Sequence, residues 1–469
     1  MISLFDFQES ALGEISAAWR NGRRAPALVM PTGSGKTTTF CEAANRAANR
    51  GKNTLILVHR RELLKQTSRT LDGFGIDHGM IASGMSFFRE KPVQVASVQT
   101  LAKRLDKLRG WTPHLIVVDE CHHAISGNTW GAALAHFSGT RVLGVTATPQ
   151  RLDGKGLGAG QGGFFDALII GPSVAELTER GYLSPAVVYA PKKRIDLSGV
   201  KTRMGDYAVG ALAEAVDKPS LTGDAVDHYR RICSGEPAIA FCASVAHAEH
   251  VAESFRAAGY QATSVDGKLS HAERARRIDD LGRGRLHVLT SCDIISEGTD
   301  VPVVSVAIML RPTQSLSLAL QQMGRALRVH PGKDRAVILD HAGNVFRHGL
   351  PDDDRDWSLE GQQKTARQKK SDAEPVKQCE RCFTVHRLAP VCPACGFAYP
   401  VKPREIAQVD GDLEQITAGA EKREKKREQG KAGSFDQLLE LGRARGYKNP
   451  YAWASHIWNA RQSRAGVAA

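Results

Sequence analysis

A phosphate-binding turn is the first candidate for chemistry in this sequence. Residues 29–40 read VMPTGSGKTTTF, in which an apolar run leads into a glycine turn, a lysine and three threonines. A strand, a glycine turn and a helix in that order direct backbone N–H groups at an anion, at the positive end of the helix. Lys36 would reach the outer phosphates of a nucleotide, and the Thr37 hydroxyl would bind Mg²⁺. The residues expected around the phosphates are Pro31, Thr32, Gly33, Ser34, Gly35, Lys36, Thr37 and Thr38.

Two adjacent acids end a later apolar run, LIVVDECHH, at residues 115–123. Asp119 is placed to hold Mg²⁺ at such a phosphate loop. Glu120 is placed to orient or deprotonate the attacking water. Successive residues of a strand point in opposite directions, so the two carboxylates can serve different partners. A polar strand end is common by itself, and the upstream loop is what favours the catalytic interpretation.

A pair of arginines far downstream completes a candidate hydrolytic site. Arg325 and Arg328 in QQMGRALR are three residues apart and would share one face of a helix. Directed at a phosphate held by another domain, they would neutralise charge in the transition state. Without the upstream motifs, the same residues would indicate a basic surface helix.

Four of the nine cysteines form a metal-binding pattern. CERC and CPAC supply Cys379, Cys382, Cys392 and Cys395. Two such pairs can place four thiolates around one zinc ion, and a closed four-sulfur site is structural. Whether the folded ribbon binds DNA or a protein partner stays open. The other five cysteines are scattered, mostly in apolar stretches, and are expected to be buried.

The order of apolar runs indicates the elements that position these residues. Short β-branched runs alternate with amphipathic stretches in two series between residue 26 and about residue 345, which predicts two tandem α/β domains with parallel sheets. Residues 153–163 and 198–207 are candidates for flexible inter-domain segments. The predicted units are 1–185 and 186–345 for the two domains, 346–378 for a linker, 379–400 for the zinc ribbon, 401–433 for a charged linker and 434–469 for a small helical tail.

The charge and the tail leave the partner undecided. The net charge is +13 and the pI about 9.4, which favours a polyanion such as nucleic acid. In the tail, Tyr447, Tyr451, Trp453 and Trp458 lie among basic residues. These rings either stack on bases or form a small aromatic core, and the core is favoured.

No apolar run is long enough to span a bilayer and no secretory signal is visible, so we expect no membrane association and a cytoplasmic location in a bacterial or phage-infected cell.

Taken in order, PTGSGKT, DECHH and TATP resemble motifs I, II and III of superfamily-two helicases of the DEAD/DEAH-box type. The resemblance covers most of the first 345 residues and is closest to the restriction-subunit-like branch of phages and bacteria. FDFQ resembles the adenine-reading motif and implies that Gln8 reads the base. VLTSCDIISEGTDVP resembles motif V and implies nucleotide contacts from Gly298 and Asp300. LVHRREL, SVQTL and motif V imply nucleic-acid contacts from Arg60, Arg61, Gln99, Thr100 and Thr290.

The resemblance implies two RecA-like parallel-sheet domains, followed by the zinc ribbon and a helical tail. It implies an ATP-dependent DNA helicase or translocase that uses ATP, magnesium and zinc and binds single-stranded, forked or branched DNA. An RNA helicase, a nucleic-acid clamp switched by ATP and the motor subunit of a larger complex remain alternatives. The clamp is disfavoured because Lys36, Asp119, Glu120, Arg325 and Arg328 are all present. The ribbon or the tail could also bind a protein partner.

Overall fold

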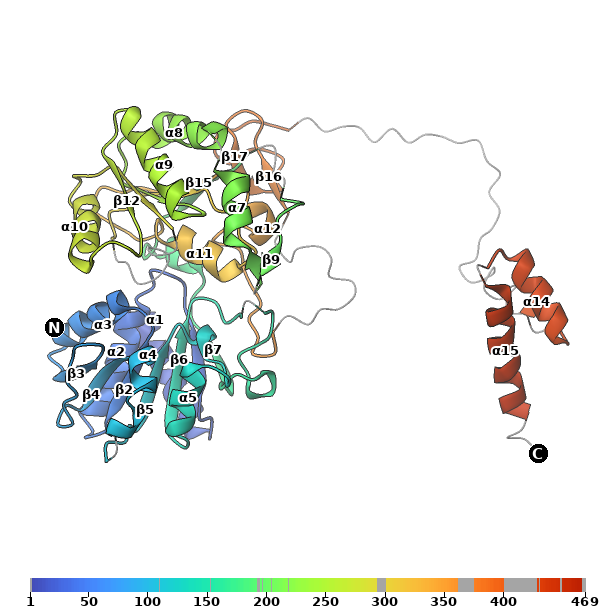
Figure 1. The fold of residues 1–469 in the computed structure, drawn as a ribbon, viewed down its shortest axis with the longest axis horizontal. Coiled ribbons are helices and arrows are strands. Elements are labelled where there is room, and N and C mark those ends of the chain that lie inside the picture. The colour runs from blue at the N-terminus through green and yellow to red at the C-terminus, as the bar shows by residue number, and fades with distance from the viewer. Residues whose placement is uncertain are drawn as a thin grey trace. The chain divides into compact units, whose positions relative to one another are not determined.

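The chain forms two compact units, Met1–Tyr399 and Pro400–Ala469. The computed structural model describes residues 2–108, 110–151, 153–191, 195, 197–203, 205–217, 219–292, 301–361, 375–399, 428–429, 431–447 and 449–465. The larger unit contains two successive α/β lobes (Figure 1). We call the elements from α1 to α6 (Asp6–Glu179) the first lobe and those from β8 to α12 (Ala186–His348) the second lobe. The predicted fold class is confirmed, and the predicted domain boundaries remain predictions.

The first lobe is built on a parallel sheet whose strand order is β3-β4-β2-β5-β6-β1-β7 among the described residues. Its central strands are buried along their whole length, which is why they read as continuous apolar runs in the sequence. The strands are β1 (Pro26–Val29), β2 (Thr54–Val58), β3 (His78–Ile81), β4 (Val93–Ser97), β5 (Leu115–Asp119), β6 (Arg141–Thr146) and β7 (Ala167–Ile170).

Helices cover both faces of this sheet. The side chains of α1, α2 and α3 belong to one apolar cluster, which includes Phe7, Phe40 and Leu64. Those of α4 and α5 belong to the cluster on the other face, with Leu101 and Trp130. The helices are α1 (Asp6–Arg20), α2 (Lys36–Ala48), α3 (Arg61–Gly73), α4 (Val98–Ala102), α5 (Thr129–His136) and α6 (Val174–Glu179), with short 3₁₀ turns at η1 (Leu105–Leu108), η2 (Cys121–His123) and η3 (Ala159–Gln161).

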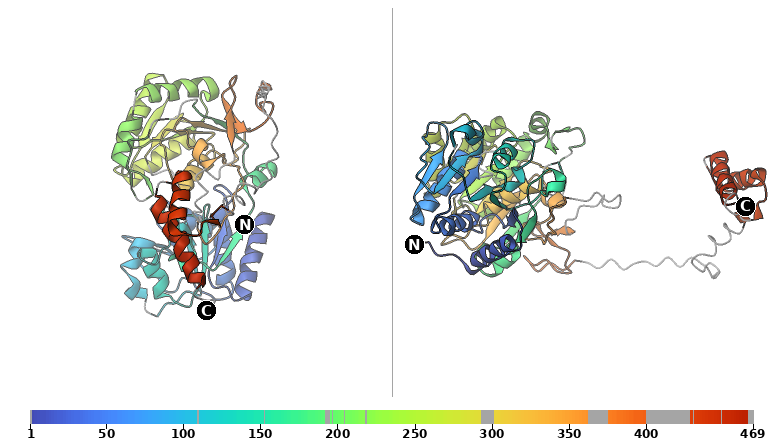
Figure 2. Two further views of the ribbon diagram at one scale, coloured as in Figure 1. Left: turned by 90° about the vertical axis from the view of Figure 1, so that its right-hand side faces the viewer. Right: turned by 90° about the horizontal axis from the view of Figure 1, so that it is seen from below.

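The second lobe repeats the plan with a mixed sheet of order β12-β13-β11-β14-β15-β8-β17-β16. Its strands are β8 (Ala186–Tyr189), β11 (Ala238–Phe241), β12 (Ala262–Val265), β13 (Val288–Ser291), β14 (Val306–Met309), β15 (Ala336–Asp340), β16 (Val376–Gln378) and β17 (Thr384–Arg387). Its helices are α7 (Val209–Val216), α8 (Pro219–Cys233), α9 (Val245–Ala257), α10 (His271–Gly282), α11 (Leu316–Gly324) and α12 (Val345–His348). The hairpin of β16 and β17 comes from the four-cysteine segment and lies at the edge of this lobe (Figure 2).

Both segments proposed as flexible inter-domain connections are built into the lobes. Residues 153–163 form an ordered glycine-rich loop of the first lobe that contains η3. Residues 198–207 include the small hairpin of β9 (Thr202–Arg203) and β10 (Asp206–Tyr207), and Asp206 accepts a hydrogen bond from the Thr313 hydroxyl at 2.8 Å. Glycine and polar composition was misread as flexibility. The loop at 153–163 is held through backbone contacts with Leu359 and Gly361, and the described residues of 198–207 are held through the Asp206 carboxylate.

The smaller unit contains a pair of helices, α14 (Phe435–Ala444) and α15 (Pro450–Ala465). Leu438 and Ala454 are buried between them, and Phe435, Trp453 and Trp458 pack against this centre. The aromatic side chains thus serve as a small core, as the sequence analysis favoured, whereas Tyr447 and Tyr451 are exposed. Across the described residues, no helix has the length and apolar character that crossing a membrane requires.

Candidate functional site

The phosphate loop joins β1 to α2 with two glycines in the left-handed region. Gly33 has φ +91° and Gly35 has φ +81°, a conformation that other residues adopt only with strain. A Cβ atom on Gly35 would also lie 2.4 Å from the Gln8 side chain. Met30, where the common form of this loop begins with glycine, is fully buried in the core, and its N–H donates to the Thr146 carbonyl at 3.0 Å. The loop keeps its shape without the first glycine because Met30 extends the sheet.

The Lys36 ammonium group lies inside this loop, in a setting suited to an anion. Its Nζ donates hydrogen bonds to the carbonyl oxygens of Met30 at 3.2 Å and Pro31 at 3.1 Å. Burial lowers the pKa of Lys36, while the nearby Glu120 and Asp119 carboxylates act in the opposite direction. A bound phosphate would favour the charged lysine in the same way as these carboxylates do.

The two predicted acids stand at the end of β5, next to this loop. Asp119 is buried, and its Oδ1 accepts a hydrogen bond from the Glu120 N–H at 3.0 Å. Glu120 has φ 50° and ψ 53°, which is unusual for a residue with a side chain and typical of strained functional positions. Thr146 Oγ1 lies 3.4 Å from Glu120 Oε2 and 2.9 Å from His122 Nδ1. The carboxylate of Glu120 therefore has a fixed hydrogen-bonding neighbourhood.

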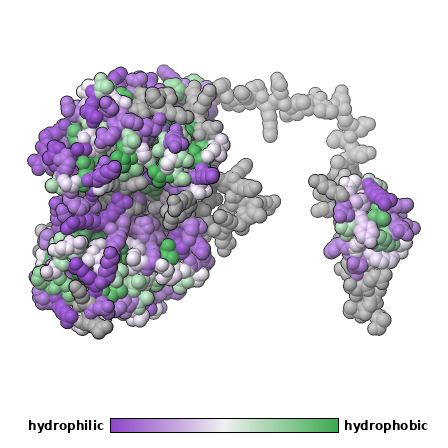
Figure 3. Space-filling model, in the orientation of Figure 1, coloured by the Kyte–Doolittle hydropathy of each residue, from purple (hydrophilic) through white to green (hydrophobic). Residues whose placement is uncertain are grey.

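The arginines of the second lobe line the same cavity as the phosphate loop. Arg325 follows α11 and is buried, and Arg328 lies three residues further along. A cavity of about 1110 Å³ is lined by Thr32, Gly33, Gly35, Lys36, Thr37, Thr38, Asp119, Glu120, Arg325 and Arg328, among other residues. On the face shown in Figure 3, hydrophilic residues are prominent along the junction between the two lobes. Both lobes thus contribute charged side chains to one cavity.

Direct contacts hold the lobes against each other beside this cavity. A Cβ atom on Gly324 would lie 2.6 Å from the Thr32 side chain, so α11 packs on the phosphate loop only because residue 324 is glycine. The hydroxyl groups of Thr148 and Ser317 are 2.6 Å apart. Thr148 follows β6, and Ser317 belongs to the first turn of α11.

The predicted base reader is fully engaged with the phosphate loop. Gln8 is buried, and its Nε2 donates to the carbonyl oxygens of Ser34 at 3.1 Å and Gly35 at 3.4 Å. Its Oε1 accepts from the Phe5 N–H at 3.0 Å. In this conformation Gln8 supports the loop, and its role toward a base remains a prediction. Gly298 and Asp300, the other predicted nucleotide contacts, lie outside the described residues.

The predicted nucleic-acid contacts fall into different environments. Gln99 is exposed and Thr100 half-buried on α4, and Arg60 immediately precedes α3, with its Nε donating to the His59 ring at 3.2 Å. Arg61 lines the large cavity. Thr290 lies in an environment that disfavours the predicted contact: its side chain is fully buried, and its hydroxyl donates to the Ala248 carbonyl at 2.7 Å. Its contact with nucleic acid stays a prediction.

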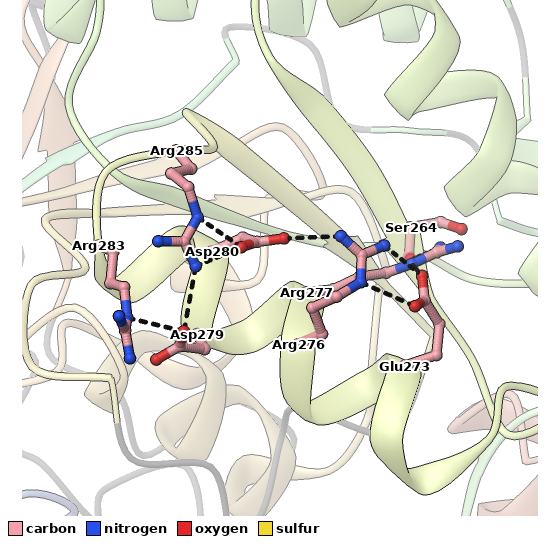
Figure 4. Close-up of polar contacts among 8 residues, drawn as sticks. All are labelled: Ser264, Glu273, Arg276, Arg277, Asp279, Asp280, Arg283 and Arg285. Carbon is pink, nitrogen blue, oxygen red and sulfur yellow. Dashed lines mark hydrogen bonds and ion pairs between the residues drawn. The ribbon is translucent and has the colours of Figure 1, made fainter.

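An ion pair that the sequence did not reveal spans the cavity. Arg274 of α10 donates to Glu62 of α3 at 2.7 Å, and its other nitrogen donates to the carbonyl oxygens of Asp266 and Leu269. Further arginines of α10 and of the turn after it pair with acids of the same segment (Figure 4). These pairs are Glu273 with Arg276 and Arg277, Asp279 with Arg283 and Arg285, and Asp280 with Arg276 and Arg285. This part of the basic charge is neutralised locally.

The four cysteines come together as the spacing predicted. Their sulfur atoms all lie within 4.8 Å of one another. Cys379 and Cys395 are 3.7 Å apart at sulfur, as are Cys382 and Cys392. Four sulfurs at about 2.3 Å around a tetrahedral zinc ion would be about 3.8 Å apart, so the donor set fits this metal. The Arg381 N–H donates to the Cys379 sulfur at 3.4 Å, which favours the thiolate form.

A phosphate loop on one RecA-like lobe and arginines facing it from the next define a two-lobed nucleoside triphosphatase. The family described as "Type III restriction enzyme, res subunit" matches residues 1–151, and "Helicase conserved C-terminal domain" matches residues 224–330. The "51.5 kDa protein" of a Lactococcus phage is 33% identical over 390 residues, 82% of this chain and 81% of that protein. The "Putative ATP-dependent helicase IRC3" of Saccharomyces cerevisiae is 29% identical over 359 residues, 72% of this chain and 51% of that protein.

A solved structure has the same fold over most of the larger unit. A fragment of an HsdR subunit of a type I restriction enzyme from Vibrio vulnificus matches with a TM-score of 0.57 at 20% identity, covering 74% of this chain and 65% of that chain. The chain spans about half the length of the yeast relative, so the activities of such whole proteins do not transfer directly. The chain belongs to the superfamily-two helicases, in the branch related to restriction-enzyme subunits, and it is an ATP-hydrolysing helicase.

Proposed function

We propose that the protein couples ATP hydrolysis between its lobes to movement along DNA or unwinding of DNA. The observation that carries this proposal is the single cavity lined by Lys36, Asp119 and Glu120 from the first lobe and by Arg325 and Arg328 from the second. Because the charged groups come from both lobes, hydrolysis depends on the lobes being closed. Loss of the outer phosphate then removes the attraction that holds them together.

Each residue has a proposed role in this reaction. The backbone N–H groups of the loop and Lys36 bind the β- and γ-phosphates, and Glu120 orients or deprotonates the attacking water. Arg325 and Arg328 neutralise charge that develops on the transferred phosphoryl group. Thr37 and Asp119 would hold Mg²⁺, which supplies further charge neutralisation when it is bound. Cys379, Cys382, Cys392 and Cys395 would hold a structural zinc ion.

DNA is proposed as the track because the chain is related to restriction-enzyme subunits, which belong to systems that act on DNA. Arg60, Gln99 and Thr100 are the proposed contacts with the strand backbone, since arginine, amide and hydroxyl groups suit phosphate oxygens. Thr290 is left out of this set because its hydroxyl is buried. We place the reaction in the cytoplasm of a bacterial or phage-infected cell, in keeping with the phage relative.

The deciding experiment is the ATPase rate of the full chain with single-stranded, duplex, forked and branched DNA and with RNA, at one salt concentration. The proposal expects DNA of at least one form to stimulate hydrolysis well beyond RNA of equal length. Stronger stimulation by RNA would favour the RNA-helicase alternative. Stimulation by neither, with ATP bound tightly, would favour a clamp or a motor that needs a further subunit.

A further inference from the structure

A segment with linker-like composition crosses back from the second lobe to the first. We call residues 349–361 the strap; their sequence is GLPDDDRDWSLEG. The sequence analysis included these residues in a linker, but they make ordered contacts with both lobes. The strap therefore forms a second link between the lobes besides the chain that leads from α6 to β8. It continues covalently from the second lobe and is held on the first lobe by noncovalent contacts.

The far end of the strap docks on the glycine-rich loop of the first lobe. The Gly158 N–H donates to the Leu359 carbonyl at 3.0 Å, and Lys155 and Gly361 form an antiparallel bridge. The Leu359 side chain packs against the apolar cluster that contains Trp130. A Cβ atom on Gly156 would lie 1.8 Å from the Leu359 carbonyl oxygen, so the strap can approach only a glycine there. Two glycines of this loop, Gly156 and Gly158, thus face the backbone of the strap.

The near end of the strap is fixed to the second lobe. Leu350 is buried in that part of the core, and Asp353 is buried with its carboxylate accepting from the Leu350 N–H at 2.8 Å. The Arg355 guanidinium donates to the carbonyl oxygens of Asp353, His348 and Leu350 at 2.7, 3.2 and 2.7 Å. These contacts fix the strap to the second lobe as far as Arg355, so only a short stretch bridges from there to Leu359.

The four-cysteine ribbon also contacts the second-lobe end of the strap. Strand β17 pairs antiparallel with β8, through Thr384 with Tyr189 and Val385 with Val188. Arg387, the last residue of β17, forms ion pairs with Asp353 at 2.7 Å and with Asp352 at 3.2 Å. The ribbon thus joins the sheet of the second lobe and places a guanidinium group on the strap.

The strap also borders the catalytic machinery. A second cavity, of about 380 Å³, is lined by strap residues Pro351, Asp354 and Trp357, by Pro31 and Thr32 of the phosphate loop, and by Leu320 and Leu327 of the arginine-bearing segment. A change in the distance between the lobes must change the walls of this cavity and the path of the strap together.

We propose that the strap is a tether that limits how far the ATP cleft opens, and that the zinc ribbon anchors its second-lobe end through Arg387. An extended chain spans about 3.3–3.6 Å per residue, so the six residues from Asp353 to Leu359 allow at most about 22 Å between these two anchors. Within that limit, the docked strap favours closed lobes and lowers the entropy cost of closing on ATP. The proposal uses the helicase assignment only in that the two lobes move, and it makes no use of the identity of the nucleic acid.

The test compares two glycine substitutions in one loop of the full-length protein. Gly156→Ala forces the strap away, whereas Gly160→Ala is the matched control because nothing lies within 4 Å of its added Cβ. Label pairs on non-natural amino acids at the exposed positions Glu14 and Glu253 report the distance between the lobes. We expect Gly156→Ala to broaden and lengthen the nucleotide-free distance distribution and to raise the KM for ATP about three- to ten-fold, with Gly160→Ala unchanged. Equal distributions for the two variants would overturn the tether.

A second substitution guards against local misfolding of the glycine loop. Leu359→Ala removes the apolar anchor from the strap itself, and the exposed Glu360→Gln is its control. Leu359→Ala should lengthen the lobe distance in the same direction as Gly156→Ala. If Leu359→Ala leaves the distance unchanged, the strap does not restrain the lobes, whatever happens to Gly156→Ala.

The role of the ribbon has its own measurement. Arg387→Gln removes the ion pairs to Asp353 and Asp352, and Arg381→Gln in the exposed part of the ribbon is the control. Hydrogen–deuterium exchange of residues 349–361 should accelerate in Arg387→Gln and not in Arg381→Gln. Removal of metal from the purified protein with a chelator should have the same effect. Unchanged exchange after both treatments would remove the ribbon from the proposal and leave the ribbon as a separate module.

Discussion

Glu62 and Arg274, from opposite lobes, form an ion pair of 2.7 Å across the ATP cleft. Glu62 lies in the first turn of α3, and Arg274 is held by two backbone carbonyls next to α10. The acids of α10 pair with arginines of their own segment (Figure 4). Arg274, in contrast, pairs with an acid of the first lobe. The pair thus couples the positions of the lobes directly.

A double-mutant cycle of Glu62→Gln and Arg274→Gln should give a coupling energy of about 1 kcal/mol in denaturant unfolding, as expected for a partly buried pair. Burial raises the pKa of Glu62, but hydrogen bonds from its own backbone and from Arg274 outweigh burial and hold the pKa below its ordinary value. A lowered folded-state pKa means that the coupling is complete above the ordinary carboxyl range and is lost as pH falls through the lowered pKa. A coupling that instead disappears between pH 8 and 6 would contradict this assignment.

Variants of Lys36 in the phosphate loop and of Glu120 should distinguish ATP binding from ATP hydrolysis. Lys36→Ala should abolish turnover, because the outer phosphates lose their positive partner. Glu120→Gln should still bind ATP but block hydrolysis, because an amide cannot deprotonate water. Equilibrium nucleotide binding and single-turnover hydrolysis measure the two steps, with the exposed Glu14→Gln as the control. Near-normal turnover in Glu120→Gln would remove the role given to that carboxylate.

The arginines of the second lobe should affect chemistry more than nucleic-acid affinity. Arg325→Ala or Arg328→Ala should lower the hydrolysis rate by about 10³-fold or more, since arginine fingers contribute that much. Arg335→Ala serves as the control, because Arg335 is an exposed arginine of the same lobe that pairs with Glu236. Fluorescence anisotropy with labelled DNA should give nearly unchanged affinity. If affinity falls while the rate at saturating DNA holds, the segment is a nucleic-acid contact and not a finger.

The ribbon should carry one zinc ion per chain as purified. Four thiolates at tetrahedral spacing form a closed site, so Cys392→Ser should reduce metal content and lower the melting temperature of the protein. Metal analysis by mass spectrometry gives the stoichiometry, and the buried Cys233→Ser, outside the cluster, controls for the loss of a thiol. A full-length protein prepared without chelator that contains no zinc would contradict this prediction.

Removal of the second compact unit should leave the ATPase intact. A chain ending at Tyr399 keeps both lobes, the strap and the ribbon. We expect it to hydrolyse ATP at a normal rate with saturating DNA. If the tail binds DNA, more DNA is needed for half-maximal rate, and the salt dependence of affinity decreases by about one unit of slope per lost phosphate contact. An unchanged DNA requirement would assign the tail to a protein partner or to stability.

The candidate catalytic and metal-binding residues could be located from the sequence alone. The phosphate loop, the acids Asp119 and Glu120 and the two cysteine pairs are short patterns whose geometry depends on neighbours within a few residues. Continuous apolar runs likewise predicted the parallel sheets, because a strand buried on both faces has no polar positions. The two α/β lobes were therefore determined by local composition and order.

Contacts between distant segments were decided only by the tertiary structure. Glu62 and Arg274 are 212 residues apart, and nothing in the types of their neighbours connects them. Thr290 matched a nucleic-acid motif, yet the packing of α9 on β13 buries its hydroxyl. The composition around Gly156 and in the acidic strap predicted flexible segments, but in the structure the strap backbone packs directly against Gly156. Composition reports the local preferences of a segment, whereas burial and backbone pairing depend on which remote segment the fold brings against it.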